Sequence, residues 1–296
     1  MTTIPRHTYT TLQRSLRHDI PPMRLYHKAK KLGTWDPRAI DLTKDRQDWL
    51  NMPQKKREAL RNLLVGFQAG EEAVTLDLLP LLMTVAREGR LEEEMYLTTF
   101  LWEEAKHTEF FRRIFDEVLE EPGALVEQKA SSDTGGRNLF TEDLTHDMHI
   151  LLTDPSPVNQ VRASIIYNMI IEGVFAETGY YSFSRMLSQE KIMPGLMEGI
   201  QLIKRDESRH IAYGVFFISR HVAQDKSLWP VVEARMHELY DRARNNRSDQ
   251  PPTPEQEEIR NFAYQQFQKR LNRIAKAREQ TLEDVYQIAN IEEEAN

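Results

Sequence analysis

Apolar side chains recur every three or four positions along most of the chain, which is the spacing of one face of an α-helix. Four long segments show this pattern: residues 53–87, 91–118, 156–191 and 194–223. Two shorter amphipathic segments follow, residues 228–244 and 254–278. The pattern predicts an all-α protein with a four-helix bundle core, around which the later helices pack.

Proline and capping residues mark several helix ends. Pro157 is expected at the first position of its helix, and Thr253 opens a capping box with Gln256. Pro80 lies inside the first long segment, where it predicts a kink. Residues 121–142 contain Pro-Gly and Gly-Gly pairs and are expected to form a long crossover loop.

The long segments must share one core, so we expect a single domain over residues 1–296. Its predicted parts are an N-terminal arm and short helix (1–50), a core (53–224), and accessory helices with a tail (225–296). The first 40 residues carry eight Lys or Arg and only two acids, which also suits a transit peptide. We favour an arm over the bundle, because Leu25 and Trp35 offer apolar anchors and no cleavage site follows an apolar run.

Two of the predicted helices carry the motif Glu-x-x-His, as Glu104 with His107 and as Glu207 with His210. Residues three apart lie on the same face of a helix, so each motif can direct a carboxylate and an imidazole toward the bundle interior. A bundle that binds two metal ions takes one further Glu from each of its other two helices.

Helical periodicity selects these Glu residues, because a ligand must lie on the stripe that faces the interior. Glu71 lies on an apolar stripe, whereas the stripe of Glu72 is partly polar. The same comparison selects Glu104 over Glu103, which shares its face with Lys106.

The third long helix offers two candidates. Glu172 shares a stripe with Ile165 and Met169, and Glu177 also has apolar neighbours; we favour Glu172 and keep Glu177 open. Four carboxylates in one core would need positive charge to stay ionised, since burial of an unpaired carboxylate is costly. The set therefore predicts a dinuclear metal site.

Composition narrows the metal and the class of protein. The chain has no cysteine, which excludes thiolate ligands, disulfides and a cysteine nucleophile. Oxygen and nitrogen ligands suit iron or manganese. A net charge of −7 gives no sign of a nucleic-acid surface, and no apolar run approaches the ~20 residues of a membrane span. We expect a soluble cytoplasmic protein.

The whole chain resembles the ferritin-like superfamily and, within it, the ribonucleotide reductase small-subunit group. It is most similar to the ligand-binding oxidases that share this subunit's fold. The resemblance is carried by Ala69-Gly-Glu71-Glu-Ala-Val74-Thr, Trp102-Glu-Glu104-Ala-Lys-His107, Tyr167-Asn-Met-Ile-Ile-Glu172-Gly and Asp206-Glu207-Ser-Arg-His210.

The resemblance implies how the ligands divide between two metals. Glu71, Glu104 and His107 would bind the first metal, and Glu172, Glu207 and His210 the second, with Glu104 and Glu207 free to bridge. It also implies a manganese/iron pair that activates molecular oxygen, although the ligand types alone allow di-iron.

The family further implies an ether crosslink between a tyrosine and a valine beside the metals, at Tyr167 and Val74 in this sequence. Without the resemblance, both would be interpreted as core residues. Tyr167 and Glu172 are five positions apart, about 140° on a regular helix. A local π-bulge would let both face the metals, and such bulges are frequent at functional sites.

A hydrophobic ligand is also implied, a long-chain fatty acid or a similar small molecule. Met169, Phe175, Ile200 and Ile203 are candidates for its channel, although such residues are more often plain core. Tyr180 and Tyr181 are expected to be packing residues, and His146 and His149 surface or capping residues. The resemblance suggests a homodimer and leaves the external reductant unknown.

Three functions remain open: an oxygen-activating oxidase, a radical-generating reductase subunit, and a metal-storage or binding protein. Phe111 stands where many radical-generating subunits have a tyrosine, four residues after the first ligand histidine. The C-terminus also lacks a tyrosine near its end. Both departures favour the oxidase.

Overall fold

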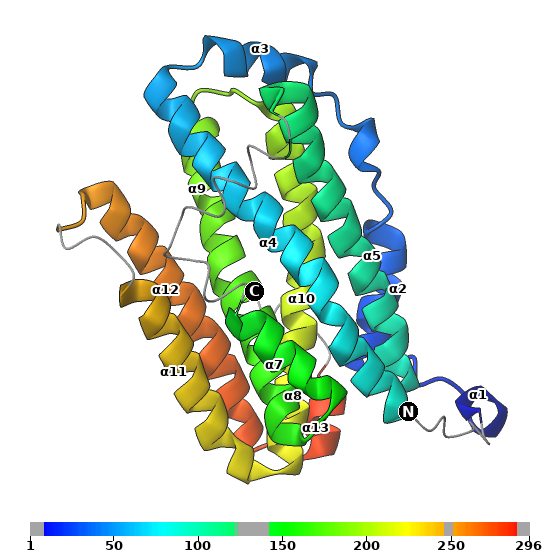
Figure 1. Ribbon diagram of the computed structural model, residues 1–296. Coiled ribbons are helices and arrows are strands. Elements are labelled where there is room, and N and C mark those ends of the chain that lie inside the picture. Colours follow the sequence, from blue (N-terminus) through cyan, green and yellow to red (C-terminus); the bar gives the residue numbers. More distant parts are fainter. Residues whose placement is uncertain (1–8, 122, 124–141, 246–250, 289–296) are drawn as a thin grey trace.

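The computed structural model describes residues 9–121, 123, 142–245 and 251–288, and these form helices and connecting segments without a β-strand (Figure 1). The core consists of four long helical stretches. They are α4 (Gln54–Arg87), α5 (Leu91–Arg113) with the π-helix η2 (Ile114–Leu119), the helix made of α8 (Pro157–Ser164), η5 (Ile165–Ala176) and α9 (Glu177–Leu187), and α10 (Pro194–Gln224). All four predicted long helices are present, and the fold is the predicted ferritin-like bundle.

Shorter elements surround this bundle. In chain order they are α1 (Thr10–Gln13), α2 (Pro21–Leu32), η1 (Pro37–Ala39), α3 (Thr43–Asn51), α7 (Thr145–His149), η4 (Ile150–Leu152), η6 (Lys226–Leu228), α11 (Trp229–Asn245), α12 (Pro254–Ala275), η7 (Lys276–Arg278) and α13 (Leu282–Tyr286). The arm helix α2 packs against α5 and α10, whereas α11 and α12 pack against η5. Most of the predicted crossover loop lies outside the described residues.

Several local predictions are confirmed. Pro157 is at the start of α8, and Thr253 forms the capping box with Gln256 at the start of α12. Pro80 lies inside α4, where Thr84 donates a hydrogen bond to its carbonyl oxygen over 2.9 Å; the kink expected there stays a prediction. No helix in the described ranges combines the length and apolar character that a membrane span requires.

The bundle interior contains two apolar clusters. The first includes Val74, Phe100 and Tyr167 and extends toward α11 and α12. The second includes Phe110 and Phe111 and lies toward α3. Both clusters contain residues from α4, α5 and α10, and a set of charged side chains on these helices lies between them.

Candidate metal centre

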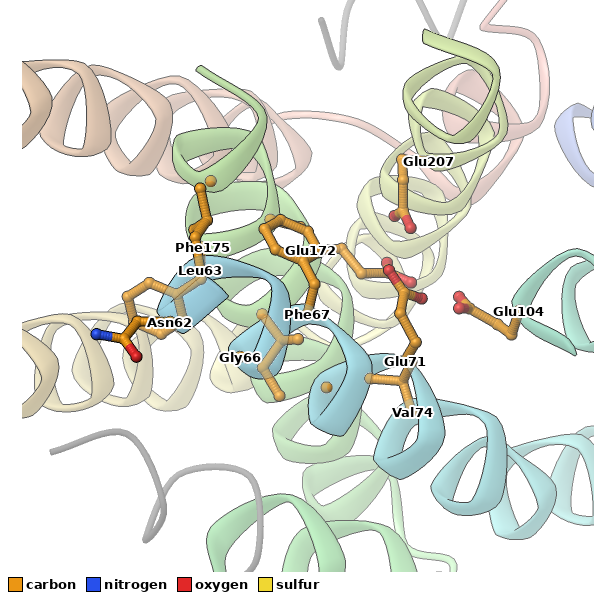
Figure 2. A pocket seen from close by; sticks show the side chains of 14 residues that line it. Asn62, Leu63, Gly66, Phe67, Glu71, Val74, Glu104, Glu172, Phe175 and Glu207 are labelled. Atoms are coloured by element: carbon orange, nitrogen blue, oxygen red, sulfur yellow. The ribbon is translucent and has the colours of Figure 1, made fainter. Parts of the chain in front are cut away.

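Six side chains converge inside the bundle, and all six residues are buried. Glu71 comes from α4, Glu104 and His107 from α5, Glu172 from η5, and Glu207 and His210 from α10. Figure 2 shows the four carboxylates directed toward one another. These are the six residues selected from the sequence as metal ligands.

The ligand atoms form two overlapping groups. Glu71, Glu104, His107 and Glu207 can each place one atom within 4.8 Å of the others, and so can Glu104, Glu172 and His210. Glu104 belongs to both groups. Glu207 approaches both histidines, with its Oε1 3.5 Å from His107 Nδ1 and its Oε2 3.6 Å from His210 Nδ1. The two carboxylates expected to bridge are therefore central in the cluster.

Several of these atoms have no hydrogen-bond partner. They are Glu104 Oε2, His107 Nδ1, Glu172 Oε1, Glu207 Oε2 and His210 Nδ1. His210 Nδ1 lies 3.1 Å from Glu104 Oε1, but the angles do not form a hydrogen bond. Buried polar atoms in proteins are nearly always paired. Unpaired ligand atoms on five of the six converging side chains therefore fit a pair of metal ions.

Burial and mutual repulsion shift the acidities of the carboxylates. Burial raises the pKa of Glu71 to about 8 and raises the pKa of Glu172 well above its ordinary value. Burial also acts to raise the pKa of Glu104, but His107 and His210 outweigh it and lower that pKa. Without metal, the cluster thus binds protons that cations would replace.

The pKa values of His107 and His210 are raised, whereas burial ordinarily lowers the pKa of an imidazole. Burial alone would lower their pKa values, yet the neighbouring carboxylates raise both well above 6.5. The largest favourable contributions come from Asp206 for His107 and from Glu103 for His210. Both residues lie outside the six-ligand cluster.

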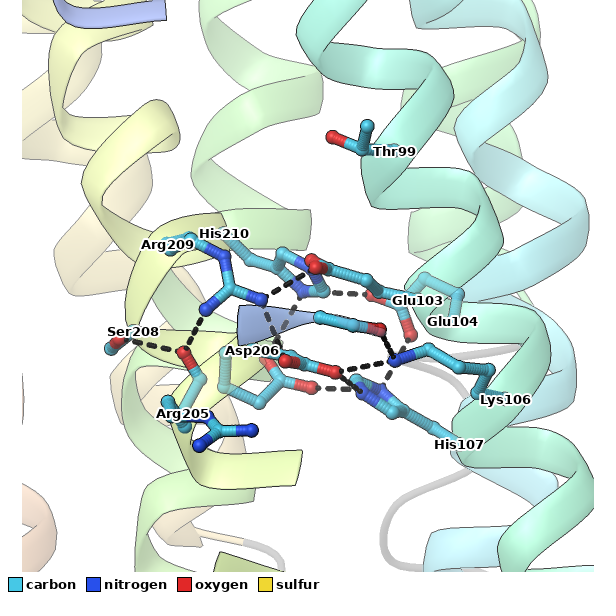
Figure 3. A network of polar contacts seen from close by, with 12 residues as sticks. Thr99, Glu103, Glu104, Lys106, His107, Arg205, Asp206, Ser208, Arg209 and His210 are labelled. Carbon is cyan, nitrogen blue, oxygen red and sulfur yellow. Dashed lines mark hydrogen bonds and ion pairs between the residues drawn. The ribbon is translucent and has the colours of Figure 1, made fainter. Parts of the chain in front are cut away.

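A second layer of charged residues contacts the outer nitrogen of each histidine (Figure 3). His107 Nε2 lies 3.3 Å from Asp206 Oδ2, and His210 Nε2 lies 2.9 Å from Glu103 Oε2. A carboxylate on one imidazole nitrogen fixes the tautomer that offers the other nitrogen to a metal. Each histidine from one motif is thus oriented by an acid from the other motif.

Basic residues and the N-terminal arm complete this layer. Asp206 accepts hydrogen bonds from Lys106 over 3.0 Å, from Trp35 over 2.7 Å and from Arg209 over 2.6 Å. Arg209 also donates to Glu103. Two buried acids are therefore matched by two buried bases, so this layer is close to neutral by itself.

Helical periodicity in the sequence did not identify this second layer of charged residues. Glu103 was set aside in favour of Glu104, but it is fully buried. A signal was present: Glu103-Glu104-Ala-Lys106-His107 and Asp206-Glu207-Ser-Arg209-His210 share the order acid, Glu, small residue, base, His. The contribution of Trp35 had no such signal, because the arm is distant in sequence.

The sequence predicted a local π-bulge near Tyr167 and Glu172; the structure has a longer π-helix there, from Ile165 to Ala176. It places both Tyr167 and Glu172 at the cluster. The Tyr167 hydroxyl donates to the Val74 carbonyl oxygen over 3.0 Å and lies 3.5 Å from Glu104 Oε1. Burial raises its pKa well above the ordinary value of 10.0, so this phenol is protonated at neutral pH.

The other residues considered in the sequence lie outside the six-ligand cluster, and one of them contacts it. Glu177 belongs to neither group of ligand atoms, although burial raises its pKa. Tyr180, for which packing was the favoured expectation, also reaches the site, with its hydroxyl 3.5 Å from Glu207 Oε1. His146 and His149 have exposed side chains and contact Asp147 and Asp77.

A cavity of about 230 Å³ extends from the cluster between α4 and the η5–α9 helix. The carboxylates of Glu71, Glu104, Glu172 and Glu207 form its inner end, and its walls are mainly apolar, including Phe67, Val74, Ile171 and Phe175. Of the four candidate channel residues, Phe175 lines this cavity. Met169, Ile200 and Ile203 lie in the two buried apolar clusters and are not among the described residues that line it.

Replacing Glu104 by Ala removes an oxygen shared by both ligand groups. We expect metal bound after reconstitution with manganese and iron to fall from about two ions per chain to fewer than one. Glu72→Ala is the matched control, because Glu72 is exposed on α4. Mass-spectrometric metal analysis decides the outcome: equal losses in both variants would contradict this assignment.

The metal-free protein should lose stability as the pH rises from 6.5 to 8. Glu71 ionises near 4.5 in the unfolded chain but has a pKa of about 8 when folded, and both histidines have raised folded pKa values. The folded state thus binds more protons than the unfolded state in this range, and its free energy of unfolding falls with pH. Urea unfolding measures this slope; bound metal should largely abolish it, and a metal-free slope of zero would contradict the prediction.

Comparisons with known proteins agree with this geometry. The family described as "Ribonucleotide reductase, small chain" matches residues 22–249. An R2-like ligand-binding oxidase from Sulfolobus acidocaldarius is 34% identical, with 94% of this chain and 98% of that chain covered and a TM-score of 0.85.

Variants of R2-like ligand-binding oxidases with anaerobically reconstituted Mn/Fe cofactors are also similar. Two of them are each 33% identical, with TM-scores of 0.81 and 0.83, over 90% and 91% of this chain and 98% of theirs. The family match covers well over half of the sequence and includes all six converging ligands, and the chain therefore belongs to the ribonucleotide reductase small chain family.

Proposed function

We propose that this protein is an oxidase that activates molecular oxygen at a manganese/iron pair. Glu71, Glu104 and His107 would bind the first metal, and the second would be bound by Glu172, Glu207 and His210. The unpaired, inward-directed atoms of this buried cluster are the observation that carries the proposal. The choice of manganese with iron is supported by the Mn/Fe cofactors of the similar oxidases.

When bound, the metal pair supplies a site for reduction of O₂ and two of the four electrons that convert O₂ to water. The protein's own residues create the conditions for this chemistry. Asp206 and Glu103 orient His107 and His210. The buried position of all six ligands limits access of water, so most of the approach to the metals is through the apolar cavity.

Tyr167 and Val74 would supply the other two electrons by forming an ether link. The phenolic O–H bond and a C–H bond of the Val74 side chain break, and a C–O bond forms between the two residues. Two protons and two electrons leave, and O₂ accepts the electrons. Support comes from the Tyr167 hydroxyl, which donates to the backbone carbonyl oxygen of Val74 and lies beside Glu104.

The second substrate would be a long-chain fatty acid or a similar hydrophobic molecule. The cavity has the form such a ligand requires, with charged residues at its inner end and apolar walls beyond them. Two metal ions at the inner end would attract a carboxylate, and Phe67 and Phe175 would contact the chain. This arrangement also fits the ligand-binding activity named for the similar oxidases.

The alternative functions have less support. Phe111 is fully buried with its ring 5.1 Å from that of Phe67, so its position provides no phenol for a stored radical. Metal storage would require a route for many ions, whereas this cluster is buried, has six ligands, and is reached by a cavity whose walls are mainly apolar.

We also propose a homodimer. Leu76, Leu79 and Met83 lie three and four positions apart on α4 and are 63%, 42% and 41% exposed. An exposed apolar helix face of this kind is typical of a protein interface.

The crosslink can be tested by mass. Aerobic reconstitution with manganese and iron should lower the intact mass by two hydrogen atoms and join the peptides that contain Tyr167 and Val74. Tyr167→Phe removes the phenol but should retain both metals, because Tyr167 is not one of the six ligands. An unmodified Tyr167 peptide from a fully metal-loaded wild-type sample would contradict the crosslink.

A further inference from the structure

Phe175 contributes to two cavities. It lines the apolar cavity of the metal centre, and it also lines a second cavity of about 270 Å³ between η5, α11 and α12. Figure 1 shows α11 and α12 together on one side of the helix that contains α9. One aromatic side chain thus stands between two spaces of similar volume.

The second cavity differs from the first in its chemistry. Its lining residues include two bases, Arg244 and Arg260, one acid, Glu257, and the aromatic residues Tyr240 and Tyr264. The charged residues of this wall therefore carry a net positive charge. Arg260 is partly buried and Arg244 is exposed. Within the described part of the chain, neither guanidinium forms an ion pair with a carboxylate. An anionic group in this cavity would therefore gain charge-assisted hydrogen bonds without displacing an existing ion pair.

The two cavities together have charged groups at both ends and an apolar middle. The inner end would bind a carboxylate through the metals, and Phe67 and Phe175 lie along the apolar part. A simple fatty acid would place its methyl end near Arg260, which gives no electrostatic gain. A chain with a second acidic group would satisfy both ends.

We propose, on the basis of the proposed function above, that the cavity between α11 and α12 is a second subsite that binds the distal anionic group of a long-chain α,ω-dicarboxylic acid. Phe175 separates this subsite from the metal-centre cavity. Rotation of the ring about its two side-chain torsions connects them without movement of the backbone. Phe175 is only partly buried, so its ring is less constrained than those of fully buried aromatic residues.

Binding of two matched series of acids tests the proposal. Saturated monocarboxylic acids from dodecanoic to docosanoic acid, and the corresponding diacids, would compete with a fluorescent fatty acid for the manganese/iron-loaded protein. At the best chain length, the diacid should bind about tenfold more tightly than the monoacid, as expected of one charge-assisted contact. Equal affinities at every length would overturn the proposal.

Substitution of the two arginines tests whether they bind the distal acidic group of the diacid. Arg244→Gln combined with Arg260→Gln should remove the advantage of the diacid and leave binding of the monoacid unchanged. Arg242→Gln is the matched control. Arg242 is on α11 like Arg244, but it pairs with Asp143 instead of lining the cavity. A diacid preference that survives in the double variant would overturn the assignment of the subsite.

Phe175→Ala tests separately whether the Phe175 ring separates the two cavities. Joining two cavities of about 230 and 270 Å³ should shift the preferred monoacid toward longer chains, and an unchanged length preference would overturn the role of Phe175. Failure of the wild-type protein to bind any acid of either series would instead contradict fatty-acid binding in the proposed function, and the subsite with it. Metal content and thermal unfolding of each variant show whether the metal centre and the fold are intact.

Discussion

The structure depends on how a bundle interior accommodates four carboxylates that face one another. Isolated burial of even one ionised carboxylate is unfavourable, and here Glu71, Glu104, Glu172 and Glu207 come from four helical stretches. Without metal, part of this charge is neutralised by protons, as the raised pKa values of Glu71 and Glu172 show. Two cations would replace the protons and connect all four stretches at one point.

The layer outside the ligands is organised differently. Glu103 and Asp206 are paired with Lys106 and Arg209 inside the protein, so their charges are balanced before any metal binds. This layer can therefore orient the two histidines in the metal-free protein. The N-terminal arm takes part through Trp35, which explains physically why an arm distant in sequence packs beside α5 and α10.

Helical periodicity predicted much of the fold and of the cluster, because it reports which face of a helix is buried. It selected Glu71 over Glu72 and located the long helices to within a few residues. Periodicity did not predict that Glu103 is buried. The reason is that α5 is buried on more than one face, so that polar neighbours such as Lys106 are buried as well. Periodicity also could not separate cavity walls from solid core: Phe175 lines a cavity while Met169, Ile200 and Ile203 pack in the interior, a difference that depends on how neighbouring helices fit together.

Anomalous X-ray scattering from crystals of the metal-loaded protein tests the central claim most directly. Data collected at the manganese and iron absorption edges locate each element independently of its assumed ligands. We expect two peaks in the bundle interior, one near His107 and one near His210, with Glu104 and Glu207 between them. A single peak, or metal bound elsewhere while these six side chains remain unliganded, would contradict this expectation.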